Sequence, residues 1–477
     1  MKKRKFNIFL LLTIMHLYSI SSSNAGEKTE KDDTLTVKYS VEKPINKKII
    51  EDKETLDFEC LEQLNLNSFK KIDLISAIEK VICNDSDNKI AWIQTKIHAQ
   101  NLNIEKSSYY PIITSSLNYS LEKNKYKIES QQAVKNEKNI NHNVNLKTSW
   151  LLYDFGSRYH RINEAKNLLA MSLALEDSTL QTIILKTITS YYTIVEYEFQ
   201  KENIKELVQS AEKNYEIANE RYKVGVGNKS DQLQLYSNLI KAKSEYKLIN
   251  GKLKIAKGEL GILMGNPSLD DFDVSTQLYT PETLDLEPIK DLIEQAKEDH
   301  PRFKALYFSI NAAEEKIKTL KRSNYPTISF ISDYNNSEQS NQSFSSTQSH
   351  QIQAGIQVDI PIFDGFSRKY QIAKAEKDLE LKILEREKLE EEISIQIWKN
   401  YKEIELTFEN IRDLISLKES AEQAYNISQG RYKAGVGNII EVIYAQNFFN
   451  DANMNYLTEL KKFINLRYLL LYNIGKL

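Results

Sequence analysis

The chain has 477 residues, and its 64 Lys and Arg nearly balance its 66 Asp and Glu. This balance argues against a nucleic-acid partner, which calls for a strongly basic surface. Only 14 glycines and eight prolines interrupt the chain, so the composition excludes a loop-rich or collagenous protein and favours long helices. The mean hydropathy of −0.50 excludes a helical membrane bundle, but not a membrane β-barrel, whose alternating strands leave little trace in such an average.

Residues 1–25 have the three parts of a secretory signal peptide. Residues 2–5 are all basic, residues 6–18 are mostly apolar, and Ser23-Asn24-Ala25 is a small-residue cleavage site. The alternative is a transmembrane anchor, for which the apolar part is short. We expect an exported protein in which residues 26–64 form an N-terminal periplasmic segment.

The two cysteines, Cys60 and Cys83, both lie near the start of the mature chain. In an oxidising compartment, two lone cysteines are predicted to form a disulfide. The bridge would join the N-terminal segment to a helix that we expect to begin near Leu74. The alternative is two free thiols.

The rest of the chain is one unit written twice. The sequence Arg-Tyr-Lys-Val-Gly-Val-Gly-Asn at 221–228 recurs at 431–438 with seven of eight residues identical. Asp154, Ser157 and Arg158 recur at the same spacing as Asp364, Ser367 and Arg368, and Tyr110-Pro111 recurs upstream as Tyr325-Pro326. We therefore predict a first structural repeat at 65–288 and a second at 289–477.

Each repeat is predicted to contain a helix, two strands, a very long helix, a turn and a shorter helix. Residues 157–224 contain no glycine or proline, and residues 366–434 contain only Gly430. Helices of this size would be about 100 Å long. The shorter helices, expected at 232–263 and 440–474, can fold back on them across the Gly-Val-Gly-Asn turns.

Two strands are predicted before each long helix. Residues 143–152 and 351–360 alternate between apolar and mostly polar side chains, as in a strand with one solvated face or in a membrane barrel. Their partners are expected near 113–121 and 328–334. Polar loops are expected to join the pairs at 125–140 and 335–349.

The sequence offers no constellation for catalysis. The six histidines are scattered without metal-ligand spacing, and Gly225-Val226-Gly227 lacks the remaining glycine of a dinucleotide loop and follows a helix. No phosphate-binding loop is present, so energy would have to come from a partner. We expect neither enzyme activity nor a metal or cofactor.

Four strands cannot close a barrel, and lipid tolerates no open sheet edge, whereas three chains would supply twelve strands. With the paired turns and the Tyr-Asp-Phe-Gly and Phe-Asp-Gly-Phe segments, this arrangement resembles the TolC-like outer-membrane efflux protein family over about residues 57–475. The resemblance implies a mainly α fold with a membrane β-barrel. Three chains would form a homotrimer with a 12-stranded barrel in outer-membrane lipid and a long α-helical coiled-coil barrel in the periplasm. It implies an exit duct of a tripartite efflux or type I secretion system, working with a periplasmic adaptor protein and an inner-membrane pump.

The resemblance also implies sites at the two helix-turn-helix tips. The adaptor would dock on the tips, at Tyr222, Gly225, Val226, Gly227, Tyr432, Gly435, Val436 and Gly437. The family's first acidic pore residue falls on Glu441, and the second falls on Tyr444, where this chain departs from the pattern. The family's gating arginine falls on Gly437 and its acidic partner on Asp231, so the latch is altered here.

One rival interpretation is a periplasmic coiled-coil scaffold or adaptor protein without a barrel. An adaptor needs a compact β-rich domain outside its hairpin, and the sequence shows no such run of short strands.

Overall fold

The computed structural model describes residues 71–128, 133–266, 272–275, 280–341 and 347–477, which belong to one unit of the chain beginning at Asn65. The predicted signal peptide, the segment 26–64 and Cys60 lie outside the described residues. The Cys60–Cys83 bridge therefore remains a prediction, with Cys83 placed half-buried near the end of helix α1.

The first repeat begins with a two-residue strand and two helices that meet end to end. Its elements are β1 (Lys71–Ile72), α1 (Leu74–Asn84), α2 (Ser86–Ser107), β2 (Ile112–Ile128), β3 (Ala133–Tyr153), α3 (Ser157–Lys223), α4 (Lys229–Leu263) and β4 (Asp273–Val274). Asp85 separates α1 from α2, and its carboxylate accepts hydrogen bonds from the amides of Asp87 and Asn88 at 2.8 and 3.3 Å. This side-chain cap satisfies amides that the first turn of a helix leaves unpaired.

The helices and long strands of the second repeat follow one another in the same order. Its elements are α5 (Ile289–Asp299), α6 (Pro301–Arg322), β5 (Thr327–Asn341), β6 (Thr347–Asp359), α7 (Ser367–Lys433) and α8 (Ile439–Asn473). His300 takes the place of Asp85 as the cap, and its Nδ1 accepts from the amide of Arg302 at 3.1 Å. Burial, with the nearby charges of Arg302 and Lys304, lowers the pKa of His300 to about 4, so the imidazole caps the helix in its neutral form.

The long helices α3 and α7 each span 67 residues, within a residue of the predicted bounds. Each begins after two consecutive left-handed residues, Phe155-Gly156 and Gly365-Phe366. The order of phenylalanine and glycine is reversed between the repeats, although the backbone conformation is the same. A phenylalanine in this conformation is strained, so the tertiary structure imposes the turn on both repeats.

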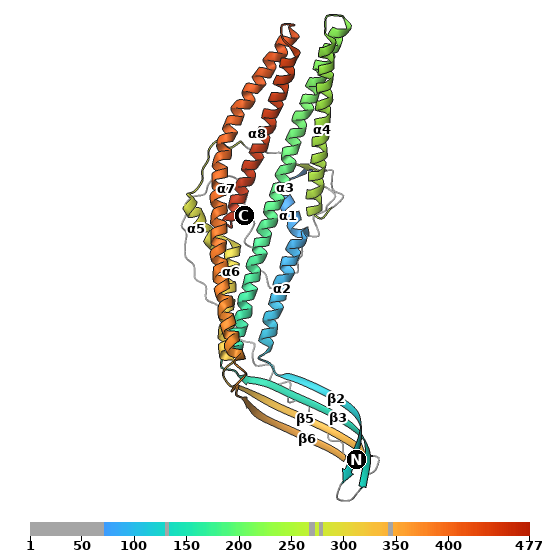
Figure 1. Cartoon of the computed structure of the whole chain (residues 1–477), viewed down its shortest axis with the longest axis vertical. Helices are drawn as coiled ribbons and strands as arrows, with labels where there is room; N and C mark the ends of the chain where they lie inside the picture. Colours follow the sequence, from blue (N-terminus) through green and yellow to red (C-terminus); the bar gives the residue numbers. More distant parts are fainter. Residues whose placement is uncertain (1–70, 129–132, 267–271, 276–279, 342–346) are drawn as a thin grey trace, which may run out of the picture. The chain divides into compact units, whose positions relative to one another are not determined.

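The four long strands form one antiparallel sheet in the order β2-β3-β5-β6, as Figure 1 shows. The polar loops predicted at 125–140 and 335–349 are wrong over most of their length. Glu122 pairs with Asn139, and Asn336 pairs with His350, so both hairpins continue far into the polar sequence. Backbone ladder bonds do not require apolar side chains, so polarity alone did not mark the strand ends.

The helices pack in two rows that share α3 and α7. In one row α2 packs on α3, α3 on α6 and α6 on α7, and in the other α4 packs on α3, α3 on α8 and α8 on α7. Each repeat has its own large core. One core gathers around Ile194 and Leu260, and the other gathers around Ile397 and Leu460.

Helix α3 contains the one window among the described helices that is long and apolar enough to cross a membrane, with a mean hydropathy of 1.3. Because α3 packs against α1, α2, α4, α6 and α8, apolar side chains are needed on several of its faces.

Candidate functional site

The two Gly-Val-Gly-Asn turns are complete helix caps. In the first turn the carbonyl oxygen of Arg221 accepts from the amides of Val226 and Gly227 at 3.0 and 2.8 Å. The side chain of Asn228 then accepts from the amide of Ser230 at 3.0 Å and starts α4. The second turn repeats the pattern around the Arg431 carbonyl and Asn438. The motif therefore ends one helix and begins the next.

The four glycines are required for two different reasons. Gly225 and Gly435 both have φ of +78°, which favours glycine. Gly227 and Gly437 have no such φ, but a Cβ atom there would lie 2.8 and 2.9 Å from backbone atoms of the preceding helix. By contrast, a Cβ atom at Gly225 would meet no atom within 4 Å, and one at Gly435 would meet only the Arg221 guanidinium at 3.9 Å. The first glycine of each turn is exposed and remains accessible to a partner.

The two tip tyrosines have different environments despite their matching sequence. Tyr222 is 40% exposed, with the Lys229 ammonium 4.8 Å from its ring. Tyr432 is only 4% exposed and lies under the Arg221 guanidinium at 5.4 Å. Burial raises the pKa of Tyr432, with a smaller contribution from the carboxylate of Asp231. Tyr432 therefore holds the two hairpins together instead of offering its ring to a partner.

The surface of the tips consists mainly of the two valines and a groove. Val226 and Val436 are 70% and 72% exposed. A groove of about 650 Å³ lies between α4 and α8, lined by Leu233, Ser237 and Asn238 on one side and Ile440, Ile443 and Asn447 on the other. Next to the groove the Asn238 side chain donates to Gln446 at 3.3 Å and joins α4 to α8. An apolar groove beside exposed turns can accept a helix.

Of the predicted pore residues, Asp231 and Glu441 lie in the first turns of α4 and α8, and Tyr444 lies in the second turn of α8. Glu441 is in an ion pair with Arg431 at 3.5 Å, and both side chains are about half exposed. Asp231 occupies the same position in α4 and is half-buried near Tyr432. Tyr444 is 72% exposed and stacks on Phe448. Arg221 lies over the Tyr432 ring and Arg431 pairs with Glu441, so both arginines bind within the tip.

Sequence reasoning missed a buried arginine at the junction of sheet and helices. The Arg158 side chain is 4% exposed, and its Nε lies 3.2 Å from Asp154. Its Nη1 donates to the carbonyls of Ser108 and Leu151 at 3.2 and 2.7 Å, and its Nη2 donates to Leu152 at 3.1 Å. One side chain therefore ties the ends of α2 and β3 to the start of α3.

The second repeat has a weaker version of this junction. Arg368 binds Asp364 at 2.7 Å, but its other contacts are with the Pro361 carbonyl alone, at 3.4 and 3.5 Å. The Asp-x-x-x-Arg spacing was visible in both repeats, so the ion pairs could have been predicted. The sequence could not have predicted that only the Asp154–Arg158 pair is buried.

A second network joins the two repeats through α3 and α8. The Glu196 carboxylate is 5% exposed and binds the Lys461 ammonium at 2.7 Å. It also accepts from Gln200 and Thr458 at 2.9 and 2.8 Å. The buried charge is therefore fully paired, as a low-dielectric site requires.

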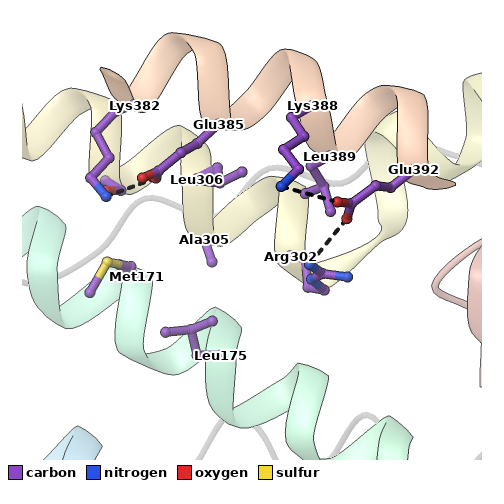
Figure 2. A pocket seen from close by; sticks show the side chains of 11 residues that line it. Met171, Leu175, Arg302, Ala305, Leu306, Lys382, Glu385, Lys388, Leu389 and Glu392 are labelled. Atoms are coloured by element: carbon purple, nitrogen blue, oxygen red, sulfur yellow. Dashed lines mark hydrogen bonds and ion pairs between the residues drawn. The ribbon is translucent and has the colours of Figure 1, made fainter. Parts of the chain in front are cut away.

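The pocket in Figure 2 lies between α3, α6 and α7 and has a volume of about 380 Å³. Met171, Leu175 and Ala305 form its apolar side. The charged groups at its rim bind one another, in the pairs Lys382–Glu385, Lys388–Glu392 and Arg302–Glu392. Among the described residues, moreover, no cluster of three or more His, Cys, Asp or Glu could hold a metal ion. We find no catalytic arrangement around this pocket.

The paired tips, the long helices and the four-stranded sheet define a class of protein. The model of the family "Outer membrane efflux protein" matches residues 77–266 and 292–463, one segment in each repeat. The chain belongs to this family and is an outer-membrane efflux protein.

Individual relatives agree with the family assignment. Protein CyaE of Bordetella pertussis is 21% identical over 388 residues, which cover 80% of each protein. The CmeC outer membrane channel of Campylobacter jejuni is 17% identical and has a TM-score of 0.70, with 96% of this chain and 94% of that chain covered. The outer-membrane channel OprN is 13% identical with a TM-score of 0.71, and the covered shares are 84% and 90%. These structures show the same fold.

Proposed function

We propose that three copies of this chain form one continuous exit duct through the outer membrane and into the periplasm. The sheet carries this proposal, because its described strands leave two long unpaired edges, β2 with 17 residues and β6 with 13. An open edge cannot stand in lipid. Four strands from each of three chains would close a barrel of an allowed even number.

The two faces of the sheet support a barrel with a wet lumen. Asn145 on β3 pairs with Ser116 on β2 and Asn335 on β5, so these polar side chains share one face. Leu117 and Ile352, which lie on the opposite face, are 80% and 78% exposed. An apolar face turned to lipid and a polar face turned to water fit a transmembrane barrel.

The outer helices support closure by further copies. Helix α2 carries exposed isoleucines at 90, 93, 97 and 104, and α7 carries an exposed Leu381, Ile395 and Trp398. Within this chain α2 and α7 stand at the two ends of one helix row. The apolar side of α2 in one copy would cover α7 of the next, which removes both surfaces from water.

The tips support a role for periplasmic partners. The exposed Val226 and Val436 and the groove between α4 and α8 offer docking surfaces for a helical hairpin of an adaptor protein. With no phosphate-binding loop in the sequence, an inner-membrane pump would supply the energy. Glu441, Asp231 and Tyr444, at the starts of α8 and α4, would line the narrow part of the pore.

Photo-crosslinking tests the trimer directly. Ile93 lies 14 residues before the end of α2, and Leu381 lies 14 residues after the start of α7. Both are therefore about 21 Å along their helices from the helix ends that adjoin the sheet. A photoreactive residue at Ile93 should link copies into two- and three-chain products. The control is Tyr307 on α6, which is 57% exposed on a helix whose two neighbours in the row are already present. A single-chain mass in mild detergent with no product from Ile93 would refute the proposal.

A further inference from the structure

One face of α8 combines exposed aromatic rings with carboxylates. Glu441, Tyr444, Phe448 and Asp451 follow one another at spacings of three, four and three residues, so they lie along one side of the helix. All four side chains are exposed. We name these residues the α8 stripe; α8 is drawn in red in Figure 1.

The two rings of the stripe form a stacked pair. The rings of Tyr444 and Phe448 stack at 6.2 Å between centroids with an angle of only 5° between their planes. Tyr444 is 72% exposed and Phe448 is 42% exposed, so water covers much of their surface. The face of an aromatic ring carries negative charge density and attracts cations.

Carboxylates lie on both sides of the ring pair along the helix. Asp451 has no ion pair within the described part of the chain. Glu441 is paired with Arg431 at 3.5 Å, but this pair is half exposed and therefore exchanges its partner at little cost. The stripe therefore offers two rings between two negative groups.

The first repeat provides an internal comparison. At the matching positions α4 carries Asp231, Gln234, Asn238 and Lys241, with no aromatic ring and with a lysine in place of the second carboxylate. Asn238 is buried and bonded to Gln446. Packing of the hairpin therefore does not require the aromatic and acidic residues of the α8 stripe.

We propose that the α8 stripe binds large organic cations, such as quaternary or aromatic ones, on their way through the duct. The rings take up the apolar surface of the cation, and Glu441 and Asp451 supply the opposite charge. This inference rests on the proposed function, in which α8 lines the pore. It assigns the stripe a preference for organic cations over small metal ions, which are strongly hydrated and gain little from an aromatic face.

Binding of tetraphenylphosphonium to the detergent-solubilised full-length protein tests the inference. The double variant Tyr444→Ala/Phe448→Ala should weaken binding roughly fivefold or more, since cation–π contacts contribute at least this much when two rings are lost. Tyr236→Ala is the matched control, because Tyr236 is a 48% exposed aromatic residue near the start of α4. The control should bind tetraphenylphosphonium like the wild type, because Tyr236 lies outside the α8 stripe.

The possible results separate the two proposals. Equal tetraphenylphosphonium binding in the double variant and the wild type would overturn the stripe assignment, even if the protein is a conducting trimer. A double variant that no longer forms trimers would also overturn it, because the rings would then be an interface between copies. A wild-type protein that binds the probe through the stripe but is monomeric and does not conduct would instead contradict the proposed duct.

Discussion

Replacing Arg158 with methionine should loosen the junction between the sheet and the helices far more than the same change at Arg368. Methionine keeps an unbranched apolar chain but removes the guanidinium. In the first repeat this leaves three backbone carbonyls without their donor. The buried Asp154 carboxylate loses its opposite charge and keeps only the backbone amides of residues 156 and 158 as donors. In the second repeat Asp364 is 32% exposed and can turn to water.

The burial of each Asp–Arg pair sets the expected loss of stability when its arginine is replaced. Breaking a buried ion pair by removing one partner costs about 3–5 kcal/mol. Water screens a partly exposed pair such as Arg368–Asp364, which therefore contributes far less to stability. At about 1.4 kcal/mol per factor of ten, Arg158→Met should raise the local opening equilibrium roughly 100- to 4,000-fold, and Arg368→Met should raise it far less.

Amide hydrogen exchange measures this opening locally. Peptides covering 151–160 should exchange much faster in Arg158→Met, whereas peptides covering 361–370 should change little in Arg368→Met. The exchange of α8 serves as an internal reference in both variants. Equal acceleration in the two variants, or none in Arg158→Met, would refute the argument that burial decides the strength of these junctions.

Three further outcomes are expected. Gly225→Val together with Gly435→Val should abolish export in a transport assay, while the trimer still forms. A β-branched residue at φ of +78° costs about 1–3 kcal/mol and blocks the approach of a partner. Normal export would show that the tips are only turns. The folded-state pKa of His300, about 4, lies below its ordinary 6.5, so the unfolded chain binds the proton first and stability should fall as the pH drops from about 6.5 towards 4. His300→Asp introduces the residue that caps the matching helix of the first repeat. In this variant the unfolding midpoint should depend less on pH between about 6.5 and 4. An unchanged slope would show that His300 does not cause the pH dependence. Thiol labelling of the unreduced, denatured protein should detect neither Cys60 nor Cys83, and labelling of both would exclude the bridge.

The sequence by itself determined the duplication and the helical framework. The near-identical turns at 221–228 and 431–438 placed both helix ends within a few residues, because glycine and asparagine act through local backbone geometry. Long stretches without glycine or proline set the length of α3 and α7 for the same local reason. Strand alternation located the sheet, but not its length, since backbone pairing continues through polar sequence.

The tertiary structure decided what distinguishes the two copies. Tyr222 and Tyr432 sit in almost the same sequence, yet only Tyr432 is buried, because Arg221 and the neighbouring hairpin cover it. Arg158 is buried and Arg368 is not, although both follow an aspartate by four residues. Burial depends on which residues distant in the chain pack against a position, and a local motif does not contain that information.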